Sequence, residues 1–164
     1  MRYTQSTEWA LDSLFFIAAH GDRQDFSVEE IAKAQQVSPS YLAKIFQQLT
    51  KAGILRSHRG AKGGYSLGRL PEQITLLDVA TVCEGSIPLY DCNAPAKSCS
   101  LGAKCLILST FREAERRMQE TLNGVTLQDL VESMRRNMSQ ATWLGVEGAP
   151  AGRPAEASAP ARKN

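Results

Sequence analysis

Hydrophobic residues recur with helical spacing along most of the chain, and the first such pattern covers residues 9–19. Apolar side chains occupy most faces of this segment, so we expect a largely buried helix. Thr7 precedes the pattern as the expected N-cap, and Gly21 follows it as the expected stop.

Two shorter helices are predicted next, joined by a tight turn. The first opens at Ser27, and Glu30 completes the spacing of a capping box. The second opens at Ser38, with Pro39 at the first helical position, where a missing N–H costs nothing, and it stops at Gly53. Two short helices joined in this way are typical of a helix-turn-helix.

A short hairpin follows directly. Residues 54–58 and 65–67 have the pattern of strands, and residues 59–64 between them contain three glycines and two basic residues. Glycines at such a tip supply the backbone conformations that a reversal needs. A helix-turn-helix followed at once by a basic hairpin predicts a winged helix.

A long amphipathic helix is predicted over residues 106–122, beyond a shorter helix over residues 76–83 that Gly85 ends. One face of the long helix is an apolar stripe interrupted by one acid, and this stripe extends beyond the needs of a small domain. We therefore expect it to pack in a homodimer. The stripe consists of Leu108, Phe111, Glu115, Met118 and Leu122.

The chain divides into four parts on this interpretation. Residues 1–85 form a winged helix-turn-helix DNA-binding domain, and residues 86–105 form a cysteine loop that binds a cluster. Residues 106–144 hold the dimerisation helix and a C-terminal helix, and residues 145–164 are too poor in apolar side chains to fold. The predicted fold class is mainly α with a small β-wing, a winged helix-turn-helix plus a long dimerisation helix.

The composition changes this picture little. The 164 residues are 43% hydrophobic and 22% charged, near the globular average, which excludes a wholly disordered chain. No stretch approaches the roughly 18 apolar residues of a membrane span, and no signal-peptide pattern opens the chain. We expect a cytoplasmic protein with no membrane partner.

The formal net charge of +2 is unevenly distributed. Residues 38–72 contain six lysines and arginines but one acidic residue, so the rest of the chain is net acidic. A basic block in a slightly acidic protein indicates a surface for a polyanion. The block coincides with the predicted winged helix, which makes nucleic acid the expected polyanion.

A recognition helix presents the residues of its N-terminal half to base edges in the major groove, while a wing approaches the minor groove. The expected partner is double-stranded DNA with a palindromic operator, because a dimer carries two such helices. We expect contacts from Ser38, Ser40, Tyr41 and Lys44 of the second short helix and from Arg59 and Lys62 of the wing.

Three of the four cysteines, Cys92, Cys99 and Cys105, lie within fourteen residues. Their spacing matches neither the close pairs of zinc fingers nor a Cys-x-x-Cys redox pair. Three thiolates on a glycine-containing loop suit an iron–sulfur cluster, and zinc or a redox thiol is the alternative. Cys83 lies among apolar residues and is expected to be a buried thiol.

Such a cluster needs a fourth ligand. Glu8 and Asp12 lie four residues apart on one face of the first helix, so a carboxylate is the favoured candidate. The two histidines are less suitable, because His20 ends the first helix and His58 belongs to the wing.

The motifs together resemble the Rrf2 family of bacterial regulators, which includes the IscR-, RirA-, NsrR- and RsrR-like iron–sulfur sensors. The resemblance covers about residues 1–135 and implies a homodimeric winged-helix transcription factor, often a repressor. It further implies that DNA affinity depends on an iron–sulfur cluster near the dimer interface. The motifs are Thr7–Leu11, Ser38–Lys44, Gly63–Leu67, Ile74–Val79 and the three-cysteine loop.

Two departures from the family pattern bear on the cluster. IscR-like members have five residues in each cysteine gap and a histidine shortly after the third cysteine, whereas here the first gap has six residues and Ile107 stands in that place. NsrR- and RsrR-like members use an acidic residue donated by the partner subunit, and Glu8 matches it. The RsrR-like histidine one turn on is replaced by Asp12. The resemblance supports Glu8 as the fourth ligand, and we favour a 4Fe–4S over a 2Fe–2S cluster.

We therefore expect a regulator, not an enzyme, that senses redox state, nitric oxide or iron supply through a cluster. One alternative is a cluster-free, zinc-based or thiol-based regulator of the same family. A cysteine-dependent redox enzyme is the other, and it would leave the DNA-reading half of the chain without a purpose.

Overall fold

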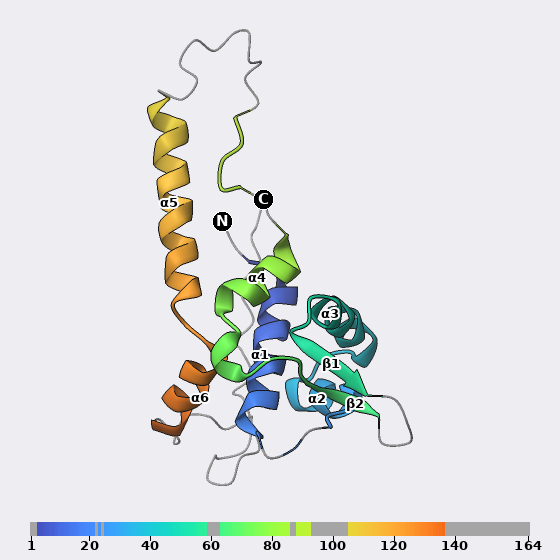
Figure 1. The fold of residues 1–164 in the computed structure, drawn as a ribbon. Helices are drawn as coiled ribbons and strands as arrows, with labels where there is room; N and C mark the ends of the chain where they lie inside the picture. The colour runs from blue at the N-terminus through green and yellow to red at the C-terminus, as the bar shows by residue number, and fades with distance from the viewer. Residues whose placement is uncertain are drawn as a thin grey trace, which may run out of the picture.

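The computed structural model describes residues 3–21, 23, 25–58, 63–85, 88–92 and 105–136. Helices surround a central helix, α1 (Gln5–Ala19), and a two-stranded sheet lies at one side (Figure 1). Within the described ranges, no helix is both long enough and apolar enough to cross a membrane.

Helix α1 forms the middle of the core. Ala10, Leu14 and Ile17 on it are at most 3% exposed, which confirms the expectation of a buried first helix. The expected N-cap is wrong: Thr4 caps the helix, and Thr7 lies inside it. The Thr7 side chain is buried and donates a hydrogen bond to a carboxylate from a later helix.

The helix-turn-helix consists of α2 (Val28–Gln35) and α3 (Pro39–Lys51). The turn between them is tight because Gln36 adopts a left-handed conformation with φ of 57°. The Ser27 hydroxyl accepts a hydrogen bond from the Glu30 amide at 3.1 Å, as expected. The Glu30 carboxylate instead binds Arg23, so the box is half formed among the described contacts.

The wing strands are β1 (Leu55–His58) and β2 (Gly64–Leu67), paired antiparallel from Leu55 opposite Leu67 to His58 opposite Gly64. Phe26 adds a bridge to Tyr65 at the open edge. Gly64 is required there, because a Cβ atom would lie 2.8 Å from the Phe26 carbonyl oxygen. This hairpin confirms the predicted wing, whose tip at residues 59–62 lies outside the described residues.

The spacing of Thr75 and Asp78 in the sequence predicts a capping box, and helix α4 (Leu76–Glu84) opens with that box complete. After a 3₁₀ turn, η1 (Pro71–Gln73), it runs beside α1, and the C-terminal helix α6 (Leu127–Arg136) also packs on α1. A bridge between Thr75 and Thr126 fixes α6 to the start of α4. The buried side chains of α6 are Leu127, Val131 and Met134.

Helix α5 (Leu106–Asn123) confirms the predicted long helix and differs from the others, because no residue on it is buried. Figure 1 shows α5 beside the helical body and extending past it, along the segment of residues 88–92. Tyr90 of that segment stacks on Phe111 with ring centroids 4.8 Å apart. Near the other end of α5, the Tyr3 hydroxyl donates to the Met118 sulfur at 3.7 Å.

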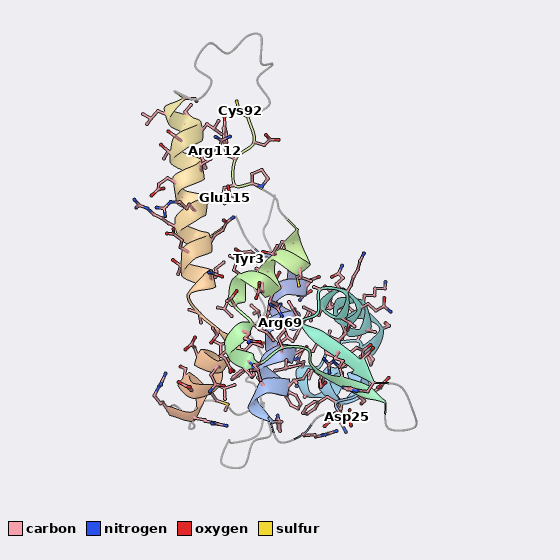
Figure 2. All side chains as sticks on the ribbon, in the orientation of Figure 1. Tyr3, Asp25, Arg69, Cys92, Arg112 and Glu115 are labelled. Atoms are coloured by element: carbon pink, nitrogen blue, oxygen red, sulfur yellow. The ribbon has the colours of Figure 1, made fainter. Side chains whose placement is uncertain are left out.

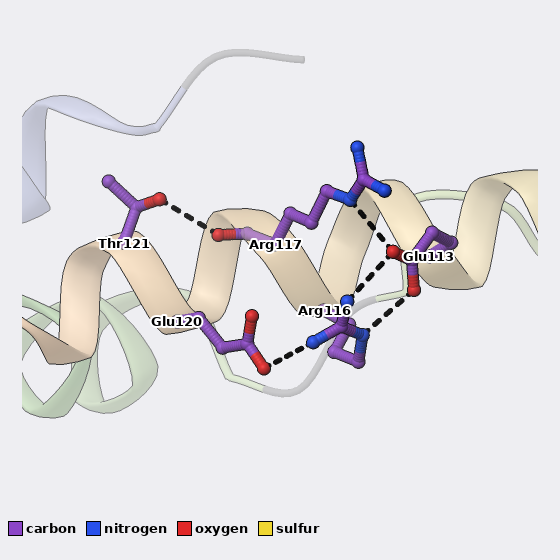
Figure 3. A network of polar contacts seen from close by, with 5 residues as sticks. All are labelled: Glu113, Arg116, Arg117, Glu120 and Thr121. Atoms are coloured by element: carbon purple, nitrogen blue, oxygen red, sulfur yellow. Dashed lines mark hydrogen bonds and ion pairs between the residues drawn. The ribbon is translucent and has the colours of Figure 1, made fainter.

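Ion pairs along α5 stabilise it without a core (Figure 3). Arg116 bridges Glu113 and Glu120, and Arg117 also donates to Glu113 at 2.7 Å. Hydrogen bonds from Arg116 and Arg117 lower the pKa of Glu113 to about 2. Pairs three and four residues apart favour the helical state, so α5 needs few contacts with the body to form.

Candidate DNA-binding surface and cysteine segment

Helix α3 separates its apolar and polar sides cleanly. Its inner face is at most 3% exposed, and its outer face carries Ser40 and Lys44, both exposed, after the exposed N-cap Ser38. The Ser38 hydroxyl bonds the Ser40 hydroxyl at 2.8 Å and caps no helix amide. These three predicted DNA contacts therefore share one accessible surface. The inner face consists of Leu42, Ile45, Phe46 and Leu49.

Tyr41 is placed differently from its neighbours. Its side chain is half-buried against the core, and its hydroxyl lies 2.8 Å from the Ser6 hydroxyl of α1. That hydrogen bond ties the recognition helix to the first turn of α1. Tyr41 is aromatic and lies far from Ser6 in the sequence, so pattern analysis gave no indication of this hydrogen bond.

The base of the wing carries basic side chains on β1. Arg56 and His58 are exposed on β1, and His58 Nε2 lies 2.7 Å from the Ser66 hydroxyl across the hairpin. Arg59 and Lys62, the predicted wing contacts, lie outside the described residues. Their role in DNA binding stays a prediction.

Two of the three predicted cysteine ligands are described. Cys92 is exposed at the end of its segment, beside the N-terminal half of α5, and Cys105 is the N-cap residue of α5 (Figure 2). Cys99 lies outside the described residues. Within the described part of the chain, no three His, Cys, Asp or Glu side chains come together as a metal site.

The surroundings of Cys105 suit an anionic group. The first turn of α5 holds no acidic residue, and no side chain caps its amide groups. The unsatisfied amides and the helix dipole favour negative charge at this end. A cluster held by thiolates carries negative charge, so Cys105 and Cys92 fit the donor set that such a cluster requires.

The proposed carboxylate ligand lies on a different part of the molecule. Glu8 is exposed in the first turn of α1, with Asp12 one turn further on, half exposed. Within one chain, Glu8, Cys92 and Cys105 do not come together as a three-residue metal site. Trp9, next to Glu8, is partly buried against the core, as expected for a core aromatic.

Glu84, which the sequence analysis missed, connects α4 to α1. Its carboxylate accepts hydrogen bonds from the Thr4 amide and hydroxyl, each at 2.7 Å, and from the Thr7 hydroxyl. Desolvation opposes ionisation of Glu84, but the bonds from Thr7 and Thr4 outweigh it and lower its pKa. An acid at a helix C-terminus is electrostatically unfavourable, and this signal could have identified it.

Cys83 is the cysteine that takes no part in the predicted ligand set. Burial raises the pKa of its thiol to about 11, so the sulfur stays protonated at neutral pH. Its Sγ donates weakly to the Ser6 carbonyl at 3.8 Å. Cys83 packs against the core but is only partly buried, so the expectation of a buried apolar thiol is confirmed in part.

The fold and the exposed face of α3 define the class of protein: a winged helix of the kind that binds DNA. The sequence profile of the Rrf2 family, described as an iron-dependent transcriptional regulator, matches residues 3–133. The chain therefore belongs to the Rrf2 family of transcriptional regulators, which confirms the resemblance in the motifs.

Relatives and solved structures agree with this placement. The chain is 38% identical to Protein aau3 of Rhizobium meliloti, over 81% of this chain and 86% of the relative. It is 33% identical to the HTH-type transcriptional regulator IscR of Sodalis glossinidius, over 81% of this chain and 80% of the relative.

Two solved structures share the fold. IscR of T. potens superposes with a TM-score of 0.68 at 27% identity, covering 86% of this chain and 94% of that one. CymR, the global cysteine regulator of B. subtilis, superposes with a TM-score of 0.64 at 26% identity, covering 81% of this chain and 98% of that one.

Proposed function

We propose that this protein is a homodimeric, cytoplasmic repressor whose affinity for a palindromic operator depends on an iron–sulfur cluster. Cys92, Cys99 and Cys105 of one subunit and Glu8 of the partner subunit would hold the cluster, with 4Fe–4S favoured. When bound, such a cluster supplies redox chemistry and reactivity toward nitric oxide. The matching family profile and the IscR relatives support a link to iron.

One observation carries this proposal: the first turn of α1 is bonded to both halves of the regulator. On one side Glu84 binds Thr4 and Thr7, and Glu84 directly precedes the segment that leads to Cys92. On the other side Ser6 binds Tyr41 of the recognition helix. Glu8 follows Thr7 directly. A force on Glu8 from a bound cluster would therefore act on a turn that already contacts α3.

Helix α5 supports the dimer. Leu106 is 78% exposed, Ile107 is 57% exposed and Phe111 is 42% exposed, all in its N-terminal half. Large apolar side chains exposed along one helix mark an interaction surface. A second copy of α5 is the proposed occupant, since this half also carries Cys105 and a twofold pairing would bring the partner's first helix toward the cysteines.

The dimer converts small movements into large changes in affinity. Two recognition helices must lie about one DNA turn, ~34 Å, apart to enter successive major grooves. A signal shifts this spacing only if it favours one of the two conformations. If the cluster on the partner subunit released Glu8, the restraint on the first turn of α1 would be lost. The spacing between the two recognition helices would then change.

The test compares Cys99→Ala with Cys83→Ala, a matched loss of one thiol outside the ligand set. Both proteins are purified without oxygen. We expect the wild type and Cys83→Ala to absorb near about 400 nm from iron–sulfur charge transfer, and Cys99→Ala to be colourless, folded and dimeric. Operator affinity, measured by fluorescence anisotropy, should then differ between cluster-loaded and demetallated wild type. Equal affinity of the two forms would contradict the proposal.

A second candidate follows from the similarity to CymR, a cysteine regulator. A cluster-free or thiol-based regulator of the same fold would bind its operator without iron. Zinc in place of iron in anaerobically purified protein, with Cys99→Ala still binding operator normally, would favour this candidate.

A further inference from the structure

A cleft of about 540 Å³ lies between the wing hairpin, the end of α1 and the segment that leads into η1. Arg56 and His58 on β1 are two residues apart, so both point to one face of the hairpin, where Ser66 of β2 joins them. Arg23 and Arg69 form part of the walls (Figure 2 labels Arg69).

The described residues that line this cleft carry charge of one sign. None of the described residues that line it is acidic. Two of its arginines have carboxylate partners outside the lining: Arg23 binds Glu30 at 2.7 Å, and Arg69 approaches Asp78 at 3.4 Å. The Arg56 side chain has no hydrogen bond or ion pair with any residue that the structure describes, so no described carboxylate compensates its positive charge.

Arg69 adds a donor that lacks an acceptor. Its Nε atom is buried with no hydrogen-bond partner in the described structure, while its Nη1 group is shared between Asp78 and the Gln73 carbonyl at 3.4 Å each. Buried polar atoms are almost always satisfied, so an unpaired buried N–H indicates an acceptor that belongs to a ligand or solvent. Arg56 therefore offers unused donors to the cleft, and the partly exposed Arg69 side chain adds a second guanidinium group to its wall.

The position of the cleft separates it from the recognition helix. Tyr65 packs its ring against Phe46 of α3, with centroids 4.9 Å apart. Tyr65 and Ser66 are neighbours on a strand, so they face opposite sides of the hairpin, and the cleft is on the side away from α3. Leu70, which is 57% exposed, and Pro71 add apolar walls, which suit a ligand with a carbon skeleton better than a DNA phosphate.

We propose that this cleft binds a small organic anion. Its carboxylate or phosphate oxygens would accept hydrogen bonds from the Arg56 and Arg69 guanidinium groups, the side chains best suited to planar oxyanions. Its apolar part would lie against Leu70 and Pro71. Because β1 continues into the wing, an occupied cleft would link the wing to the end of α1. The site does not depend on the cluster or on the proposed function of the cysteines.

Calorimetric titration of the full-length, DNA-free protein at low ionic strength tests this. The probes are inorganic phosphate, acetate and butyrate, so that the first two compare the oxyanions and the last two measure the contribution of the apolar wall. We expect saturable binding of one probe molecule per chain, with butyrate bound more tightly than acetate. Arg56→Ala should weaken it about tenfold, the effect of losing a charged hydrogen-bond donor.

Arg135→Ala is the matched control, because it removes an exposed arginine of α6 that does not line the cleft. It should leave probe binding unchanged, and both variants should melt like the wild type. Three results would overturn the proposal. They are no saturable binding below about 10 mM, equal weakening in the two variants, or a loss of operator affinity in Arg56→Ala that no probe competes with.

Discussion

Replacing Glu84 with glutamine tests whether the bond between α4 and the first turn of α1 holds the body together. The substitution preserves shape but removes the charge that Thr4 and Thr7 bond. Hydrogen bonds to a charged group are about twice as strong as neutral ones, and this carboxylate is partly exposed. We therefore expect the free energy of unfolding at pH 7 to fall by about 1–2 kcal/mol.

The loss should depend on pH in a defined direction. The pKa of Glu84 is lowered in the folded protein, so its contribution is fully present above the unfolded value of about 4.3. It is then lost as the pH falls through the lower, folded value. The difference between wild type and Glu84→Gln should thus be full at pH 7 and shrink below about pH 4.3.

Urea unfolding of demetallated protein followed by circular dichroism measures this difference, and thermal unfolding checks it at about 3 °C per kcal/mol. Glu72→Gln is the control, because Glu72 is exposed on η1 and has no ion pair among the described residues. The reasoning is refuted if Glu84→Gln behaves like Glu72→Gln, or if its defect persists undiminished in acid.

Three other predictions concern the wing, the recognition helix and the dimer. Gly64→Ala forces a methyl group against the Phe26 backbone, so it should cost about 1–3 kcal/mol of unfolding free energy; a neutral result in urea would contradict the close approach. Lys44→Ala should weaken operator binding and, if Lys44 holds a phosphate, reduce the salt slope by about one, whereas Arg135→Ala should change neither by anisotropy. Phe111→Asp should yield monomers in sedimentation, because it places a charge on the exposed apolar face of α5; an unchanged dimer would locate the interface elsewhere.

The parts of the fold that were predictable are those that neighbouring residues decide. The Thr75 to Asp78 capping box formed as expected, since its two hydrogen bonds join residues three apart. Gly53 and Gly85 end their helices with φ of 72°, a conformation that glycine adopts without strain. Such signals are complete within one turn of chain, so a sequence displays them fully.

The errors have a different origin, because each depends on a partner distant in the sequence. Thr7 has the right chemistry for a cap, but the helix starts one turn earlier and Glu84 takes the Thr7 hydroxyl. Glu30 has the right spacing for a box, but Arg23 draws its carboxylate outward. Spacing along the sequence therefore identifies residues that could form a hydrogen bond, and the packing of the folded chain determines which of them do.

The candidate site divides in the same way. The exposed face of α3 followed from helical periodicity, and the structure shows Ser38, Ser40 and Lys44 together on it. The set of cluster ligands could not be derived from the sequence in this way. Three cysteines on a loop indicate that the loop can bind metal, but they do not show how the sulfur atoms lie relative to one another. Glu8 became a candidate through its position on the first helix and was supported by the family resemblance, and its role as the partner subunit's ligand stays a prediction.

Helix α5 links the two unproven parts of the proposal physically. Cys105 occupies its N-cap, and the apolar residues Leu106, Ile107 and Phe111 lie within the next two turns, all exposed. A helix with no buried residue gains little from its own body, so whatever covers this face also fixes the position of Cys105. If a second copy covers it, the cluster site and the dimer interface are one structure, and loss of either must weaken the other. Sedimentation of demetallated protein across a concentration series would show this as a raised dimer dissociation constant.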